Sequence, residues 1–205
     1  MLKDIFIKTA SAYESDENCL ELLWQELVKK YTGKNRHYHN LAHLENMLRL
    51  ALENRALISD WDTFVFAIFY HDAVYDVLKK DNEEKSAALA EKRLAWIGFP
   101  AARIAYCREL IVATKTHLSG AGEAIGLLLD IDLSVLGAPW EQYAAYAAQI
   151  RKEYAIYPDV LYKPGRRKVL EQFLEREAIF KTQRLRERLE ALARENLCRE
   201  IALLV

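Results

Sequence analysis

The stretch that decides the fold runs from Phe64 to Asp76 and reads Phe-Val-Phe-Ala-Ile-Phe-Tyr-His-Asp-Ala-Val-Tyr-Asp. Every residue up to Tyr70 is apolar or aromatic, which is typical of a helix buried on all sides. An ionised carboxylate in a protein interior is costly unless it is paired or bound to a metal. We therefore predict a central helix, capped by Ser59 or Asp60 and ending near Leu78, that delivers His71 and Asp72 to a metal site. The alternative is that His71 caps a carbonyl group and Asp72 pairs with a Lys or Arg.

The composition indicates an all-α protein. The chain has 205 residues, of which 52% are hydrophobic, and only 7 Gly and 4 Pro interrupt long stretches rich in Ala, Leu, Glu, Lys and Arg. We expect a single helical domain over residues 1–205, with a site region at about 30–137 and C-terminal packing helices at about 138–205. A last pair of helices is expected after Pro158 and after Pro164-Gly165. The Leu spacing over 182–205 indicates a packing or dimerisation helix, so a homodimer is one expectation.

Charge and cysteine content exclude several classes of protein. The formal net charge is −1, with both signs interspersed, so the sequence has no electrostatic footprint for nucleic acid or for an anionic membrane. Three cysteines without CxxC spacing suit reduced thiols. Asp4 and Lys8 interrupt the apolar residues at the N-terminus, where a signal peptide needs an unbroken run. We expect a cytoplasmic protein.

Three of the five histidines lie close together, at His37, His39 and His43. The spacing of His39 and His43 matches the HxxxH of zinc proteases, but Asn40 stands where such enzymes need a Glu as general base. We prefer His43 as a metal ligand because it lies on the apolar-periodic part of the next helix, with His37 and His39 at the mouth of the site. The alternative is that all three are surface histidines.

Acidic residues follow the central stretch. Asp76 comes four residues after Asp72, on the same face if the helix continues, and is a candidate base for a bound water. Glu83 lies in the following turn and can fold back toward the site. Asp81 with Glu84 resembles a capping box that begins a new helix.

Lys115 and His117 end the helix expected over residues 101–118. They can neutralise phosphate oxygens, and His117 can instead be an additional metal ligand; the alternative is a solvated helix end whose positive charges suit the helix dipole.

Two carboxylates interrupt the apolar run at residues 127–137, which reads Leu-Leu-Leu-Asp-Ile-Asp-Leu-Ser-Val-Leu-Gly. We expect one of them, and favour Asp132, to complete the coordination of a metal. Asp130 then caps a helix or joins a hydrogen-bond network.

Together these motifs resemble the HD superfamily of metal-dependent phosphohydrolases, all-α domains that hold their metal with His, His-Asp and a distant Asp. A bacterial group of predicted phosphohydrolases in this superfamily is more similar still. The motifs that carry the resemblance span about residues 30–180 and read Arg-His-Tyr-His-Asn-Leu at 36–41, Tyr-His-Asp-Ala-Val-Tyr-Asp at 70–76, Asp-Asn-Glu-Glu-Lys-Ser-Ala at 81–87 and Asp-Ile-Asp-Leu-Ser-Val-Leu-Gly at 130–137.

The resemblance implies metal ligands at His43, His71, Asp72 and Asp132. Such a set suits Mn, Fe, Co, Ni, Zn or Mg, as one ion or two. The expected reaction is hydrolysis of a phosphomonoester or a nucleotide phosphoester, a small phosphorylated substrate, with proton transfer assisted by Asp72, Asp76 or Glu83. The groups available for phosphate charge or at the mouth of the site are Arg36, His37, His39, Lys115 and His117. Two other functions stay open: a di-iron oxygenase of the same fold, and a non-catalytic sensor that binds a nucleotide or metal.

Overall fold

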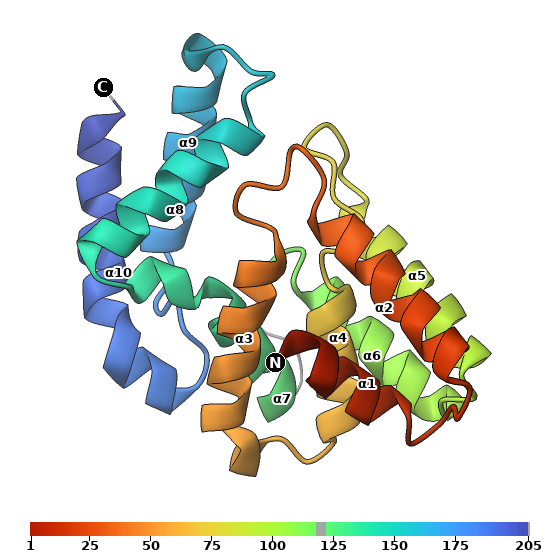
Figure 1. Ribbon diagram of the computed structural model, residues 1–205. Helices are drawn as coiled ribbons and strands as arrows, with labels where there is room; N and C mark the ends of the chain where they lie inside the picture. The colour runs from red at the N-terminus through yellow and green to blue at the C-terminus, as the bar shows by residue number, and fades with distance from the viewer. Residues whose placement is uncertain (118–121, 205) are drawn as a thin grey trace. The chain divides into compact units, whose positions relative to one another are not determined.

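The computed structural model describes residues 1–117 and 122–204, and all regular secondary structure in these ranges is helical (Figure 1). The α-helices are α1 (Leu2–Ala10), α2 (Glu17–Tyr31), α3 (Leu41–Glu53), α4 (Trp61–Tyr70), α5 (Asn82–Trp96), α6 (Ala101–Ala113), α7 (Glu123–Asp132), α8 (Trp140–Glu153), α9 (Asp159–Leu174) and α10 (Gln183–Leu203). Two short 3-10 helices are η1 (Arg55–Leu57) and η2 (Leu133–Gly137). The all-α class predicted from the composition is confirmed.

The chain divides into two compact units, Met1–Leu128 and Leu129–Val205. The boundary falls inside α7, somewhat before residue 138, where the sequence led us to place the start of the C-terminal helices. The single domain expected over the whole chain stays a prediction.

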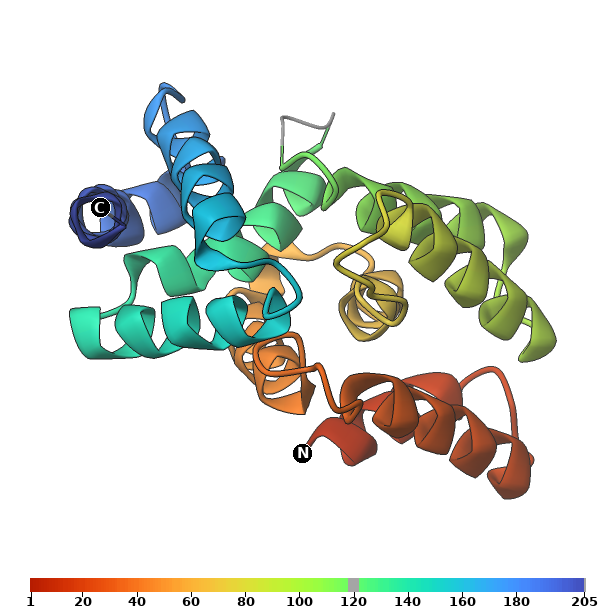
Figure 2. The ribbon, with the colours of Figure 1, turned by 90° about the horizontal axis from the view of Figure 1, so that it is seen from above.

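Helix α4 is the centre of the first unit. Every residue from Thr63 to Tyr70 is buried, as the apolar run predicts. Within this unit, α4 packs against α1, α3, α5 and α6, and Figure 2 shows it nearly end-on among them. Phe69 makes edge contacts with the rings of Phe6 in α1 and Trp24 in α2. The aromatic face of α4 therefore ties the N-terminal helices to the helix that leads to His71.

Asp60 fixes the start of α4. One of its carboxylate oxygens accepts a hydrogen bond from the backbone N–H of Thr63 at 3.2 Å, and the other accepts one from the Thr63 hydroxyl at 2.6 Å. The Arg103 guanidinium of α6 pairs with the same carboxylate. Of the two expected caps, Ser59 and Asp60, the structure uses Asp60.

The predicted extent of α4 is wrong at its C-terminal end. The helix stops at Tyr70 instead of near Leu78, and the chain then forms a loop before α5. Side chains from elsewhere satisfy the backbone of this loop. Ser86 binds both the N–H and the carbonyl of Val74, and Asn82 binds both the N–H and the carbonyl of Asp76. Because these backbone groups have partners outside a helix, the chain loses nothing by leaving helical geometry.

In the second unit, α9 continues through Pro164, where we expected a break between two helices. Proline removes one helical hydrogen bond, to the carbonyl of Val160, and that residue is 76% exposed, so water can satisfy the carbonyl. The continuous helix places Arg166 against Glu200 of α10, with nitrogen to oxygen distances of 2.8 and 3.0 Å. Glu200 also accepts a hydrogen bond from the Tyr143 hydroxyl at 2.5 Å. Helix α10 thus packs against α8 and α9 within the second unit, and dimerisation stays a prediction.

Among the described helices, none combines the length and the apolar character that crossing a bilayer requires.

Replacing Phe69 by Ala tests the central role of α4. We expect a loss of about 3–5 kcal/mol in the free energy of unfolding, because the ring is fully buried and its removal would leave a cavity where α4 contacts α1 and α2. Leu52→Ala, at a position that is 46% exposed, is the control and should cost far less. Denaturant unfolding followed by circular dichroism measures both; equal losses would contradict the account.

Candidate metal centre

His71 occupies the C-cap of α4 and is only 1% exposed. Its Nδ1 lies 2.8 Å from the carbonyl oxygen of Ile68, one turn earlier. A carbonyl only accepts, so Nδ1 carries a proton, and in the neutral imidazole the lone pair is on Nε2. This is the arrangement by which proteins orient a histidine toward a metal ion.

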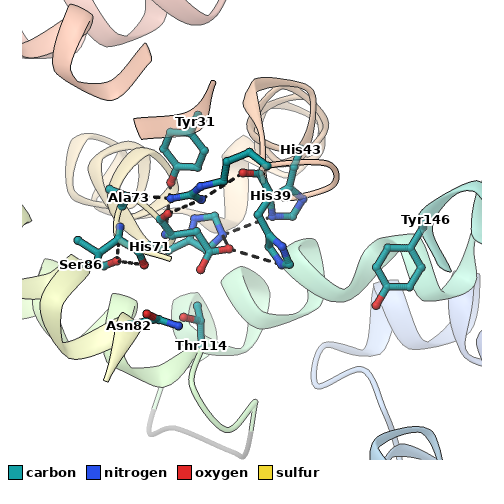
Figure 3. A network of polar contacts seen from close by, with 12 residues as sticks. Tyr31, His39, His43, His71, Ala73, Asn82, Ser86, Thr114 and Tyr146 are labelled. Atoms are coloured by element: carbon teal, nitrogen blue, oxygen red, sulfur yellow. Dashed lines mark hydrogen bonds and ion pairs between the residues drawn. The ribbon is translucent and has the colours of Figure 1, made fainter. Parts of the chain in front are cut away.

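His43 presents a second imidazole to the same point. It lies on α3, whose first turn is capped by the Asn40 side chain, and is 4% exposed. The Nε2 atoms of His43 and His71 are 3.3 Å apart, and Figure 3 shows both rings together with that of His39. The preference for His43 among the three neighbouring histidines thus agrees with its position beside His71.

Asp72 adds a carboxylate to the pair. Its Oδ2 lies 3.2 Å from His71 Nε2, and its backbone N–H donates to the hydroxyl of the buried Tyr31 at 3.3 Å. Asp72 lies beyond the end of α4, and its side chain reaches the same atom of His71 that faces His43.

The donor set fits a divalent cation. A lone pair on His71 Nε2 facing a carboxylate oxygen at 3.2 Å is repulsive unless a proton or a cation lies between them. Metal–imidazole bonds are about 2.0–2.1 Å long, so one ion can reach two nitrogens that are 3.3 Å apart. Two imidazoles with a carboxylate suit first-row divalent ions.

Arg36 holds the backbone around Asp72 in place. Its guanidinium donates to the carbonyl oxygens of Asp72 at 2.7 Å, His39 at 3.1 Å and Ala73 at 3.4 Å, and it lies 5.1 Å from the ring centre of Tyr75. From the sequence we expected Arg36 to be available for binding a phosphate group. In the structure these three donations hold the loop before α3 against the loop after α4, so Arg36 positions Asp72.

His39 lies at the edge of the centre and His37 beyond it. The Nε2 of His39 is 3.8 Å from Asp72 Oδ2, and its ring packs on that of Tyr75 at 4.4 Å between centroids. Helix α3 begins only at Leu41, so His39 lies outside it and does not share a helical face with His43, although their rings are 5.9 Å apart. His37 contributes its carbonyl, which accepts from the Asn40 side chain.

Of the two acidic residues after Asp72 that are candidate proton acceptors, Glu83 has the surroundings better suited to that role. It is half-buried at the start of α5, and burial together with the negative charge of Asp72 raises the pKa of Glu83 above its ordinary value. Asp76 lies in the loop and is exposed, and its carboxylate accepts from the N–H of Leu78 at 2.9 Å. The helical-face argument for Asp76 therefore fails, and its side chain stabilises the loop.

The acids expected to form a capping box do not form one. Asp81 precedes α5 but makes no side-chain cap and pairs with Lys85 at 2.9 Å. Glu84 pairs with Lys115, one of the two residues proposed for phosphate binding. His117, the other, follows α6 with a positive φ of 51°; its role in the site stays a prediction.

The structure separates the roles of Asp130 and Asp132. Asp130 is fully buried in the second unit, where its carboxylate accepts from the N–H of Lys181 at 2.6 Å and from the N–H and hydroxyl of Thr182 at 2.7 and 2.6 Å. This carboxylate fixes the entry into α10. Asp132 ends α7 and is half-buried. Asp130 is committed to these contacts, and the coordination of a metal by Asp132 stays a prediction.

Sequence reasoning missed the residues that hold the centre in place. Tyr31 reads as a core residue of α2, yet its hydroxyl binds the N–H of Asp72. Asn82 and Ser86 lie in the quoted 81–87 motif, and the structure shows that they bind the 74–76 backbone. No local pattern signals such contacts, although their polar side chains on an otherwise apolar or charged helix are a hint.

Comparisons with protein-family models, with curated proteins and with solved structures give no match for this chain.

Asp130→Asn tests the structural role of this carboxylate. The amide would turn an N–H group toward the donors of Lys181 or Thr182, so we expect the free energy of unfolding to fall by about 1–3 kcal/mol. Asp132→Asn is the matched control and should cost less. Denaturant unfolding measures both. A stable Asp130→Asn protein that no longer binds metal would show that the two roles are reversed.

Proposed function

We propose that the chain is a metal-dependent phosphohydrolase of the HD type, acting in the cytoplasm on a phosphomonoester or nucleotide phosphoester. His43, His71 and Asp72 hold the divalent ion, and Asp132 is the further ligand that the sequence pattern predicts. The observation that carries the proposal is the convergence of His43 Nε2 and Asp72 Oδ2 on the lone pair of His71 Nε2, at 3.3 and 3.2 Å. The three free cysteines are in keeping with a reducing compartment.

The residues of the site have distinct roles in the proposed hydrolysis. A bound divalent ion polarises a phosphoryl oxygen and lowers the pKa of water. The hydrogen bond from His71 Nδ1–H to Ile68 keeps the Nε2 lone pair in place, and Arg36 keeps Asp72 in place. Glu83 takes the proton from the attacking water, since its raised pKa lies closer to neutral pH than the pKa of an ordinary carboxylate does.

Lys115 and His39 are the groups available for the substrate. The pair of Lys115 with Glu84 is largely exposed, and solvent screens such surface pairs strongly. Lys115 can therefore exchange Glu84 for a phosphate oxygen at little cost. His39 lies beside Asp72 and can donate to a phosphate while its ring stays packed on Tyr75.

A second candidate is a two-ion centre, as in the di-iron oxygenase alternative. It is favoured by one observation: Asp72 Oδ2 lies 3.2 Å from His71 Nε2 and 3.8 Å from His39 Nε2, so one carboxylate faces two imidazoles. About two irons per chain, with visible absorption that changes on reduction, would select this function. Nucleotide binding without turnover would select the sensor.

Metal analysis of ligand variants tests the centre. We expect near-stoichiometric metal in the natural chain and a loss of affinity of at least about 100-fold in His43→Ala and His71→Ala, because each removes a ligand. His37→Ala is the control and should keep its metal. Elemental analysis after dialysis gives the content, and a phosphatase panel with the metal found gives the activity. Full metal content in His71→Ala would overturn the proposal.

Glu83→Gln tests the proton acceptor. The base must be ionised, so kcat/KM should rise with pH through the raised pKa of Glu83. The Glu83→Gln variant should lose this dependence of kcat/KM on pH, and its kcat should be lower by about 10²–10⁴-fold. Metal content should not change. Asp76→Asn, in the loop, is the control and should retain the pH profile. An unaltered rate in Glu83→Gln would remove this residue from the mechanism.

A further inference from the structure

The first unit has a hollow of about 860 Å³ that the metal centre does not use. Its walls come from three segments: α2 from Leu22 to Lys30, residues 33–36 of the following loop, and residues 73–75 of the loop after α4. The volume lies in the range of small-molecule binding sites.

The hollow is basic. Lys29, Lys30 and Lys34 line it, and none of them forms an ion pair with any residue in the ranges 1–117 and 122–204. The one carboxylate in its lining, that of Glu26, is neutralised by Arg93, whose Nε and Nη2 lie 2.7 and 2.9 Å from the two carboxylate oxygens. Three ammonium groups that form no ion pair therefore line one cavity, together with one carboxylate already paired with Arg93, whereas the chain as a whole has a net charge of −1.

The other lining groups suit a ligand that is more than a bare ion. The side-chain amides of Gln25 and Asn35 can donate and accept hydrogen bonds, and Val74 and Tyr75 add an apolar and an aromatic surface. Mobile lysines bind phosphate oxygens as point charges, and three of them match the charge of a chain of phosphates better than that of a single one.

We propose that this hollow binds a small polyanion with two or more phosphate groups, at a site separate from the metal centre. The two sites share a wall. Arg36 lines the hollow and donates to the carbonyl of Asp72, and Tyr75 lines the hollow and packs on His39. A polyanion in the hollow therefore acts on the groups that position the metal centre, which is the arrangement of an effector site.

The test is calorimetric titration of inorganic triphosphate into the full chain, after metal removal, at roughly 0.1 M salt. We expect saturable binding of one triphosphate per chain. The triple variant Lys29→Gln, Lys30→Gln, Lys34→Gln should bind at least about tenfold more weakly, because it removes the charges that recognise phosphate.

Two controls make the result specific. The triple variant Lys8→Gln, Lys79→Gln, Lys168→Gln loses the same charge from exposed positions outside the hollow and should bind triphosphate almost as the natural chain does. His71→Ala should also keep binding, whether or not the chain is a phosphohydrolase. Equal weakening in both triple variants would mean general attraction to a cationic surface, and would overturn the proposal. Loss of binding in His71→Ala alone, or no saturable binding to the natural chain, would overturn it as well.

Discussion

The structure depends on one constraint: the buried helix α4 must end at the point where His71 and Asp72 meet the imidazole of His43. Helix α4 stops at Tyr70, so His71 is still positioned by helical geometry while Asp72 is not. The hydrogen bond from His71 Nδ1–H to the Ile68 carbonyl then leaves the Nε2 lone pair directed at His43 and Asp72. Neighbouring helical residues point about 100° apart, and here the Oδ2 of Asp72, beyond the end of the helix, lies 3.2 Å from His71 Nε2.

The end of α4 needs support from outside the helix. Backbone groups that leave a helix in a buried region must find other partners. Here Tyr31 binds the N–H of Asp72, Arg36 binds its carbonyl, and Asn82 and Ser86 bind the residues that follow. The loop is thus held by α2, α5 and the segment before α3. If the centre binds the proposed metal, such a frame fixes its ligands beforehand and lowers the cost of ordering them on binding.

The sequence predicts what depends on local pattern and misses what depends on distant partners. The apolar run predicts α4 and its burial, the Leu spacing over 182–205 predicts α10, and the position of His43 on an apolar-periodic helix singles it out among the neighbouring histidines. The end of α4 could not be predicted in this way, because it depends on tertiary contacts: Arg36 lies 36 residues before Asp72, and Asn82 and Ser86 reach back from α5 to the loop. Asp130 is similar: its role depends on Lys181 and Thr182, about fifty residues later. Pro164 reads as a break because its exposed surroundings are invisible in the sequence.

The most direct test of the account is a crystal structure of the metal-loaded chain, with anomalous diffraction recorded on both sides of the absorption edge of the bound metal. The account predicts an anomalous peak in contact with the Nε2 atoms of both His43 and His71 and with the carboxylate of Asp72. A metal bound elsewhere, with the two imidazoles joined only by a shared proton, would contradict it.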